Sequence, residues 1–467
     1  MKSESRRETV VNRRTFLGLL GGSGAALMVS SRSRASIAHA SASPRLPNFI
    51  IIITDDQGYS DIGCFGSPNI KTPRLDKMAA EGVKFTDFYV AASVCTPSRA
   101  ALMTGCYPKR VGLPYVLSPA AWIGISPSEI TIAEILKTRG YATKCIGKWH
   151  LGRLPQFLPT RHGFDSYFGI PYSNDMDLPP FPPTPLMHDE NIIEQPVIQE
   201  TLTERYTEEA AKFITENKDK PFFLYLPHTM PHVPLHVSEK FKGKSARGLY
   251  GDVIECLDWS TGQILDTLAK LGLDDNTFVM FTSDNGPWLQ RGENGGSALP
   301  LRAGKGTAFE GGFRVPCIMR WRSKIPAGTV CSEAAATIDL LPTIAKLAGA
   351  EPPTDRIIDG KDIWSLMSGV PQAKSPHEAF YYYTATDLRA VRSGPWKLMS
   401  ADPARGDGDA LYNLETDISE TTNVIARHPD VATRLRQLVE IMRDDLGDTM
   451  TDRTGKNCRR PGIVAAR

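Results

Sequence analysis

Three features that would narrow the function are missing from this sequence: a long apolar run, a surplus of one charge and closely spaced cysteine pairs. Beyond the first 42 residues no stretch stays apolar for long enough to cross a bilayer, so we do not expect an integral membrane protein. The 54 basic residues nearly balance the 52 acidic ones, and the first 42 residues alone carry a net charge of +5. The remainder is slightly acidic, which argues against nucleic-acid binding.

The eight cysteines are scattered along the whole chain. No two of them form a C-x-x-C pair, so we do not expect a structural zinc site. Their spacing does not determine any disulfide pairing. Any chemistry that a cysteine performs must be read from the residues around it.

Residues 1–42 have the three parts of a Tat export signal. Arg13 and Arg14 are the twin arginines, residues 18–29 form a short apolar run, and Ala40-Ser41-Ala42 suits a cleavage site. The apolar run is too short to span a bilayer. We therefore expect an exported bacterial protein, periplasmic or extracellular, that passes through the Tat export machinery.

Four apolar runs predict buried parallel strands, at residues 48–54, 141–147, 221–226 and 277–282. Helical patterns occupy residues 129–139 and 249–271, and each is followed by a glycine that can end a helix. Alternating strands and helices predict an α/β fold with a mostly parallel sheet.

Polar residues follow each of these four strands. In chain order they are Asp55 and Asp56, then Lys148 and His150, then His228 and His232, and finally Asp284 and Asn285. Ligands bind beyond the carboxyl ends of the strands in such sheets. The sequence therefore predicts that these side chains gather in one active site.

The pattern changes in the last quarter of the chain. Short strands at residues 379–383, 388–392 and 396–398 are separated by turns, and a helix is expected over roughly 430–446. This predicts a small α+β domain with an antiparallel sheet. We divide the chain into a signal peptide at 1–42, a catalytic domain at 43–370 and a C-terminal domain at 371–467. Residues 171–196, rich in Pro, Asp and Asn, are expected to form a long loop.

Cys95 precedes a segment that favours a short helix. Thr96 suits the cap, Pro97 the first helical position and Gly105 the end. Cys95 then lies at a helix N-terminus, where the helix dipole favours an anion. By itself, this pattern also fits a small buried thiol in front of an ordinary helix.

The segment from Cys95 to Gly105 resembles a known motif. It reads Cys-Thr-Pro-Ser-Arg-Ala-Ala-Leu-Met-Thr-Gly and matches the C-x-P-S-R-x-x-x-x-x-G motif of type I sulfatases, which formylglycine-generating enzymes recognise. Residues 55–59, 147–152, 232–235, 283–286 and 304–312 resemble further blocks of that family, in family order. The similarity is especially close to the branch of arylsulfatase A and N-acetylgalactosamine-6-sulfatase. It implies an alkaline-phosphatase-like α/β fold with a small C-terminal α+β domain.

The resemblance also implies a reaction. A formylglycine-generating enzyme would convert Cys95 to formylglycine, whose hydrate offers two hydroxyl groups. One hydroxyl attacks sulfur to give a covalent sulfo-enzyme intermediate, and the other then expels sulfate. The expected substrate is a sulfated small molecule or glycan, either an aryl or a sugar sulfate.

The family's catalytic roles fall on five further residues. By resemblance, Lys148 contacts sulfate and His150 is the base, and both share one side of an extended segment. His232 and Lys305 are implied to hold sulfate and to protonate the leaving oxygen. Arg99 is implied to stabilise formylglycine and the metal site.

A metal site is implied at the ends of two strands. Asp55, Asp56, Asp284 and Asn285 supply hard oxygen ligands and, by resemblance, bind one divalent cation together with the formylglycine derived from Cys95. Several carboxylates with an amide carbonyl suit calcium better than magnesium. The cation would activate the nucleophile and offset the charge of the sulfate.

Two other functions are compatible with the sequence. One is a phosphate or phosphonate ester hydrolase on the same fold, and the other is a catalytically silent protein that binds sulfated glycans. Every expected catalytic position is filled, which favours an enzyme. The set of Lys148, His150, His232 and Lys305 favours sulfate as the group that is transferred.

Overall fold

The computed structural model of the chain describes residues 45–177, 179–401 and 408–464. The predicted signal peptide at residues 1–42 lies outside these described residues. All eight cysteines lie inside them, and each has a free thiol.

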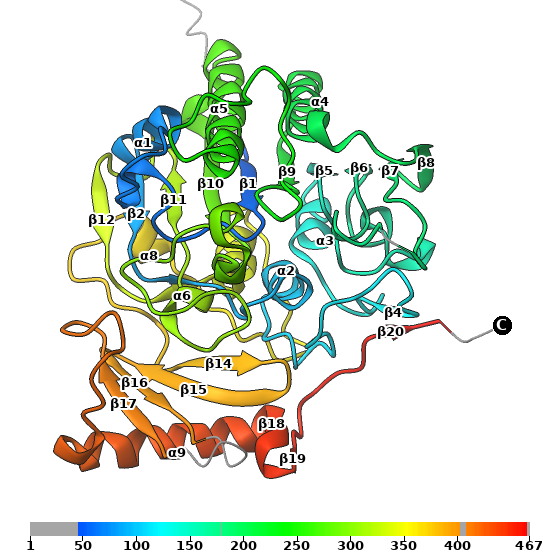
Figure 1. Cartoon of the computed structure of the whole chain (residues 1–467). Helices are drawn as coiled ribbons and strands as arrows, with labels where there is room; N and C mark the ends of the chain where they lie inside the picture. Colours follow the sequence, from blue (N-terminus) through cyan, green and yellow to red (C-terminus); the bar gives the residue numbers. More distant parts are fainter. Residues whose placement is uncertain (1–44, 178, 402–407, 465–467) are drawn as a thin grey trace, which may run out of the picture. The chain divides into compact units, whose positions relative to one another are not determined.

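A ten-stranded mixed sheet is the largest element of the described chain (Figure 1). The strand order is β12-β2-β11-β10-β1-β9-β5-β6-β7-β8, and the five strands from β10 through β6 are parallel. Antiparallel pairings extend the sheet on both sides, while β12 pairs parallel with β2. The bounds are β1 Asn48–Thr54, β2 Val83–Phe85, β5 Ala142–Ile146, β6 Ser166–Gly169, β7 Leu186–His188, β8 Asn191–Glu194, β9 Phe222–Pro227, β10 Thr277–Ser283, β11 Cys317–Arg320 and β12 Thr329–Cys331.

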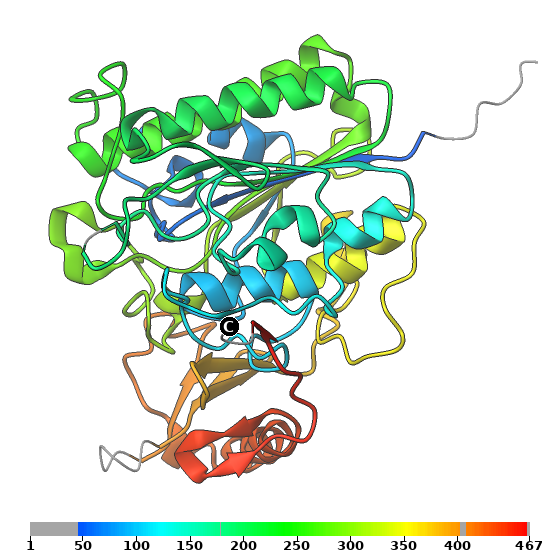
Figure 2. The ribbon, with the colours of Figure 1, turned by 90° about the vertical axis from the view of Figure 1, so that its right-hand side faces the viewer.

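The four predicted strands are confirmed as β1, β5, β9 and β10, and they are consecutive neighbours at the centre of the sheet. Helices cover both faces, with α4 and α5 on one side and α2, α3 and α7 on the other (Figure 2). The helix bounds are α1 Pro73–Ala80, α2 Cys95–Thr104, α3 Ile132–Lys137, α4 Leu202–Glu216, α5 Leu249–Lys270, α6 Glu310–Phe313, α7 Leu340–Leu347, α8 Trp364–Met367 and α9 Pro429–Leu446.

Strand β1 shows why its sequence is apolar throughout. Ile51 and Ile53 belong to the core beneath α2, α3 and α7, whereas Ile50 and Ile52 belong to the core beneath α1, α4 and α5. Successive side chains of a strand point to opposite faces, so a strand covered on both sides needs apolar residues at every position. Each isoleucine buried in this way contributes roughly 1.5–3 kcal/mol.

The helices predicted at residues 249–271 and 129–139 are both present, but only the first has nearly the predicted bounds. Helix α5 extends over almost the whole predicted range, and Gly272 follows it with φ 67°. Helix α3 begins only at Ile132, because Thr131 caps it: the Thr131 hydroxyl accepts from Glu134 N, and the Glu134 carboxylate accepts from Thr131 N. This reciprocal pairing fixes the start of the helix.

The predicted C-terminal fold is confirmed. Four antiparallel strands form a second sheet, and α9 packs against it through a shared core that also includes Tyr107 and Phe313 of the preceding part of the chain. The strands are β14 Phe380–Thr384, β15 Asp387–Ser393, β16 Trp396–Met399 and β17 Ala410–Asn413. Three short pairs complete the described strands: β3 Phe88–Tyr89 with β13 Ala335–Ala336, β4 Ile123–Gly124 with β20 Gly462–Ile463, and β18 Gly447–Asp448 with β19 Arg453–Thr454.

The expectation of one long loop over residues 171–196 is wrong. The segment contains the β7–β8 hairpin, which turns at Asp189 with φ 54° and ends the large sheet. Ile192 and Ile193 of the outermost strand are more than half exposed. An edge strand of this kind lacks the buried apolar run by which the central strands were recognised.

Candidate active site

The site begins where β1 and β10 end side by side. The parallel register pairs Thr54 with Ser283, so Asp55 and Asp284 follow their strands at the same level. The Asp284 N–H donates to the Thr54 carbonyl at 2.9 Å, which continues the ladder by one residue. Asp56 then adopts φ 64°, an uncommon and strained conformation for a residue with a side chain. Buried carboxylates from two strands are thereby brought together.

Cys95 lies at the start of α2, as predicted, but the helix begins two residues earlier than expected. Val94 is the N-cap and Cys95 the first helical residue, so Thr96 is not the cap and Pro97 is the third residue of the helix. Proline is tolerated there because the first N–H groups of a helix have no partner within it. Gly105 ends the helix with φ 67°, as predicted.

The Cys95 thiol is almost fully buried, with 3% of the residue exposed. Burial raises its pKa, and the charges of Lys148 and Lys305 only partly oppose this shift. The charges of Asp55 and Asp284 also act on the thiol, and they raise its pKa further. A thiol in this state is protonated at neutral pH and is a weak nucleophile.

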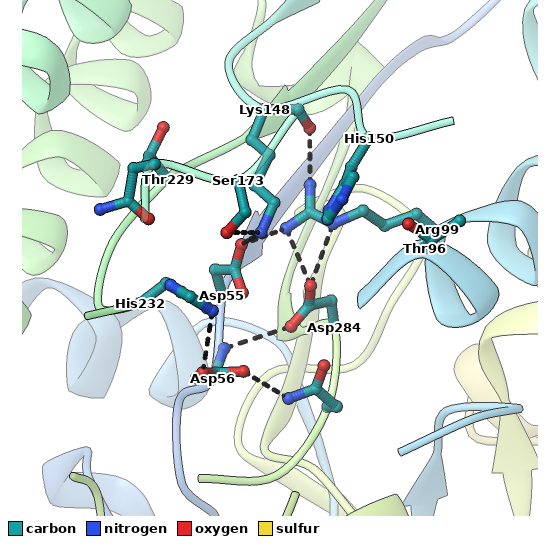
Figure 3. A network of polar contacts seen from close by, with 12 residues as sticks. Asp55, Asp56, Thr96, Arg99, Lys148, His150, Ser173, Thr229, His232 and Asp284 are labelled. Atoms are coloured by element: carbon teal, nitrogen blue, oxygen red, sulfur yellow. Dashed lines mark hydrogen bonds and ion pairs between the residues drawn. The ribbon is translucent and has the colours of Figure 1, made fainter. Parts of the chain in front are cut away.

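Arg99 lies one helical turn after Cys95 and joins the two strands. Its guanidinium contacts Asp55 Oδ2 at 3.0 Å and Asp284 Oδ2 at 2.9 Å, and it donates to the Lys148 carbonyl at 2.6 Å. Residues four apart share a helix face, so α2 presents Cys95 and Arg99 to the same cluster. Figure 3 shows this guanidinium between the carboxylates and the Lys148 segment.

Lys148 follows β5 and reaches the same aspartate. Its Nζ lies 2.5 Å from Asp55 Oδ2 and donates to Ser173 Oγ at 3.0 Å, and its side chain has no exposed surface (Figure 3). Burial would raise the pKa of Asp55, but Lys148 and Arg99 outweigh it and hold that pKa well below its usual range. Asp55 is therefore a permanent anion between two buried cations.

His150 departs from the extended backbone that the sequence suggested. Its φ is 61°, and its Nε2 lies 2.8 Å from the Leu117 carbonyl. A carbonyl only accepts hydrogen bonds, so Nε2 carries the proton and Nδ1 keeps a lone pair. Nδ1 is buried and has no hydrogen-bond partner among the described residues. Burial holds the pKa of His150 well below its usual value, so the ring is neutral.

Lys305 and His232 meet at Asp56. Lys305 Nζ lies 2.7 Å from Asp56 Oδ1, and His232 Nε2 lies 3.6 Å from Asp56 Oδ2. Trp288 packs beside both, with the Lys305 Nζ 4.6 Å from the centre of its ring. Burial would lower the pKa of Lys305, but Asp56 outweighs it and raises that pKa above its usual value. Lys305 is thus a charged ammonium at the rim of the site.

Oxygen atoms suited to a cation are present in the same place. Asp55 Oδ1 and Asn285 Oδ1 are buried and accept no hydrogen bond from the described residues. Asn285 Nδ2 donates to Asp56 Oδ1 at 2.7 Å, which leaves the amide oxygen free of that contact. Asp55, Asp56 and His232 could also place one ligand atom each within 4.8 Å of one another. Burial and the neighbouring Asp55 raise the pKa of Asp284 to about 7, a strain that a bound cation would relieve.

Comparison with known proteins assigns the chain to a family. A model of the sulfatase family matches residues 47–350, and a model of the C-terminal region of N-sulphoglucosamine sulphohydrolase matches residues 304–445. The chain belongs to the sulfatase family. The resemblance recognised in the Cys95 motif is thereby confirmed.

Individual relatives agree with the family model. Arylsulfatase A of Bos taurus is 40% identical over 448 residues, which cover 86% of this chain and 87% of the relative. N-acetylgalactosamine-6-sulfatase of Canis lupus familiaris is 41% identical over 381 residues, which cover 77% and 72%. Among solved structures, Ps i-CgsB in complex with k-i-k-neocarrahexaose matches with a TM-score of 0.75 at 33% identity, over 85% of this chain and 93% of that chain.

These matches make the chain a sulfuric ester hydrolase and confirm the predicted alkaline-phosphatase-like fold with its small C-terminal sheet domain. In the part of the chain that the structure describes, no helix is both long and apolar enough to cross a membrane.

Not every residue singled out in the sequence of this sulfatase reaches the site. His228 follows β9 but turns toward α5, where its ring lies 3.4 Å from the Ser260 hydroxyl. Conversely, Ser173 and Trp288 contact catalytic-site lysines and were not singled out individually. In the sequence, Ser173 and Trp288 are distinguished only by lying in segments that follow strands of the sheet. Such a position does not identify an individual residue.

Proposed function

We propose that this sulfatase hydrolyses aryl or sugar sulfate esters with a formylglycine formed from Cys95, through a covalent sulfo-enzyme intermediate. The observation that carries the proposal is the setting of Cys95. The encoded thiol is buried and neutral, and Arg99, Lys148 and Lys305 lie around the position, each paired with a buried carboxylate. The two lysines can contact an anionic substrate, but the thiol is not activated as a nucleophile. Conversion to formylglycine would supply the missing hydroxyl nucleophile.

Lys148 and Lys305 are proposed to bind the sulfate group. They reach the site through ion pairs with Asp55 and Asp56 respectively. Arg99 holds Asp55 and Asp284 in place and links them to α2. Fixed charges of this kind stabilise an anionic transition state because they need not reorganise during the reaction.

Proton transfer is proposed to occur at two sites. His150 accepts a proton at Nδ1, because the Leu117 carbonyl fixes the other ring nitrogen as the donor. Lys305 and His232 donate toward the leaving oxygen from the Asp56 side of the site. A base and an acid held by different partners match the two protons that ester hydrolysis must move.

Calcium is the proposed metal. Asp55, Asp56, Asp284, Asn285 and the modified Cys95 would hold it, and the unpartnered oxygens of Asp55 and Asn285 fit this role. A donor set of several carboxylates and an amide suits calcium. When bound, the cation would polarise the nucleophile and the sulfate oxygens.

The substrate class follows from the relatives only in outline. Arylsulfatase A and N-acetylgalactosamine-6-sulfatase are named for aryl and amino-sugar sulfates, and Ps i-CgsB was solved with a neocarrahexaose. We therefore propose an aryl or sugar sulfate as the substrate. We also retain the division into a Tat signal peptide at 1–42, a catalytic domain at 43–370 and a C-terminal domain at 371–467, with export to the periplasm or the exterior and maturation by a formylglycine-generating enzyme.

The nucleophile can be tested directly. Mass spectrometry of the peptide that contains Cys95, from protein made in a host with the maturation enzyme, should show formylglycine. Replacing Cys95→Ala should reduce turnover of 4-nitrophenyl sulfate by at least about 10³-fold and leave the fold intact. Cys458→Ala, at an exposed cysteine, is the matched control and should keep full activity.

Three outcomes would overturn the proposal. Full turnover by protein whose Cys95 is still a thiol would remove formylglycine from the mechanism. A clear preference for 4-nitrophenyl phosphate would favour the phosphate or phosphonate ester hydrolase. Formylglycine without turnover of any sulfate ester, but with binding of sulfated glycans, would favour the silent binding protein.

A further inference from the structure

Lys305 lies on a loop that the large sheet does not hold directly. The loop runs from Pro300 to Glu310, contains no helix or strand before α6, and passes through Ala303 with φ 58° and Gly306 with φ 78°. Near the lysine, its backbone bonds are Lys305 N to the Pro287 carbonyl and Gly306 N to the Ser93 carbonyl, both at 2.9 Å. The Gly311 N–H donates to the Arg302 carbonyl at 2.9 Å across the base of the loop, and residues from later in the chain contact its two ends.

The C-terminal part of the chain holds both ends. The Ser419 hydroxyl donates to the Pro300 carbonyl at 2.6 Å, and the Arg302 guanidinium donates to the Glu420 carbonyl at 2.7 Å. At the other end, the Glu310 N–H donates to Glu420 Oε2 at 2.7 Å. One residue, Glu420, therefore contacts the loop on both sides of Lys305.

Glu420 is itself fixed in the interior. It is fully buried and has φ 51°, a conformation that persists only where the surroundings impose it. Lys397 of β16, also fully buried, contacts Glu420 Oε1 at 2.8 Å and Glu310 Oε1 at 2.9 Å. Figure 1 shows α6, which begins at Glu310, beside the C-terminal sheet that carries Lys397.

The charges of this cluster are balanced by further contacts. Burial would raise the pKa of Glu310, but Lys397, Arg314 and Arg392 outweigh it and lower that pKa to about 2. Tyr382 also donates to Glu310 Oε1 at 2.8 Å. A buried carboxylate with this many partners is rigid, because each partner left unpaired would be costly.

We propose that Glu420 and Lys397 are positioning residues for Lys305 and that the C-terminal domain thereby completes the active site. This inference rests on the proposed role of Lys305 in binding sulfate and protonating the leaving oxygen. Lys305 Nζ must stay near Asp56 while substrate enters, and Glu420 is the one residue described above that contacts the loop on both sides of this lysine. A displacement of about 1 Å at a catalytic group can cost about 100-fold in rate.

Glu420→Gln tests the proposal with the least disturbance. Glutamine keeps an oxygen for the Glu310 N–H but removes the charge that faces Lys397. We expect kcat for phenyl sulfate, which has a poor leaving group, to fall about 10-fold or more, and kcat for 4-nitrophenyl sulfate to fall about 3-fold or less. A loss of folded protein would lower both by the same factor. Glu415→Gln, at an exposed glutamate of the same segment, should change neither.

A double-mutant cycle separates this proposal from the proposed role of Lys305. If Glu420 acts through Lys305, then Glu420→Gln should add little to the loss already caused by Lys305→Ala. Losses that multiply, or that are equal for both substrates, overturn the positioning role. An Lys305→Ala variant with normal kcat for phenyl sulfate refutes the role of Lys305 itself. If Glu420→Gln does not fold, Arg302→Met at the exposed end of the same contact takes its place, with the same two readouts.

Discussion

Lys148 and Lys305 both carry a positive charge to an aspartate that follows β1, but the molecule holds them in different ways. Lys148 directly follows a central strand, and its side chain has no exposed surface. Lys305 lies on a loop, its side chain is 11% exposed, and a region more than 100 residues later in the chain fixes that loop. Lys148 is thus held by the central sheet, whereas the loop of Lys305 is held by contacts with the C-terminal part of the chain.

The difference separates two effects that the removal of a charged site residue can have, one on stability and one on the proposed reaction. A charge buried among the central strands is strongly coupled to stability, because removing it leaves its partner buried and unpaired. A charge on a loop is coupled less strongly to stability where its partner keeps another hydrogen bond, as Asp56 does with Asn285. The two lysines should therefore respond differently to the same substitution.

The largest effect is expected for Lys148→Met. This change leaves Asp55 buried with Arg99 as its remaining close cation, so the free energy of unfolding should fall by about 3–5 kcal/mol and kcat by about 10²–10³-fold. Lys305→Met should lower kcat comparably but lower the free energy of unfolding by less than Lys148→Met does, because Asp56 keeps the hydrogen bond from Asn285. Urea unfolding and turnover of 4-nitrophenyl sulfate measure both quantities.

Lys374→Met is the control for removing a lysine as such, because Lys374 is 80% exposed and its ion pair with Glu333 lies at the surface. It should change neither stability nor kcat appreciably. Equal losses of stability in Lys148→Met and Lys305→Met would show that the two lysines are not held differently.

The surroundings of Lys148 could be predicted from the sequence, whereas those of Lys305 could not. The residues around Lys148 were predictable, because parallel strands bring their carboxyl ends to one edge and the apolar runs identify the strands. Asp55 and Asp284 are 229 residues apart in the sequence, yet the pairing of β1 with β10 places both beside Arg99. Here local pattern and global arrangement agree.

The support of Lys305 could not be predicted in this way. Glu420 and Lys397 lie 110 and 87 residues from Glu310, on short segments without a distinctive pattern. A buried glutamate and lysine look like surface residues in a sequence, since most residues of these types are exposed. The exact start of α2 was also missed, because Pro97 is compatible with more than one position in the first turn.

A smaller effect is expected from pH, through His162 beneath the Lys148 segment. His162 is fully buried, and its ring lies against that of Trp149. Burial lowers its pKa from 6.5 to about 4. Above pH 6.5 the ring is neutral in both the folded and the unfolded chain; below it, only the unfolded chain gains the proton. This contribution to stability is therefore present above pH 6.5 and is lost as the pH falls toward 4, by about 3 kcal/mol.

His162→Phe should remove that part of the pH dependence. Phenylalanine keeps an aromatic ring against Trp149 and has no group that titrates. Urea unfolding at pH 7 and pH 4 should show a fall in the free energy of unfolding that is about 3 kcal/mol smaller in the variant than in the original protein. An identical fall in both proteins would mean that His162 gains its proton in the folded state as easily as in the unfolded one.

The smallest effect concerns calcium, and it tests whether the loop of Lys305 takes part in the metal site. A cation that binds only the folded chain stabilises it by about 2.7 kcal/mol at 100 times its dissociation constant. Calcium should therefore raise the melting temperature of the protein, and Asn285→Leu, which removes a buried oxygen without a partner, should abolish the shift. Lys305→Met should keep the shift, since the loop lysine is not a ligand and its loss frees Asp56 oxygens for the metal. An undiminished shift in Asn285→Leu would place the ion elsewhere, and loss of the shift in Lys305→Met would mean that the loop, and not the strand ends alone, builds the metal site.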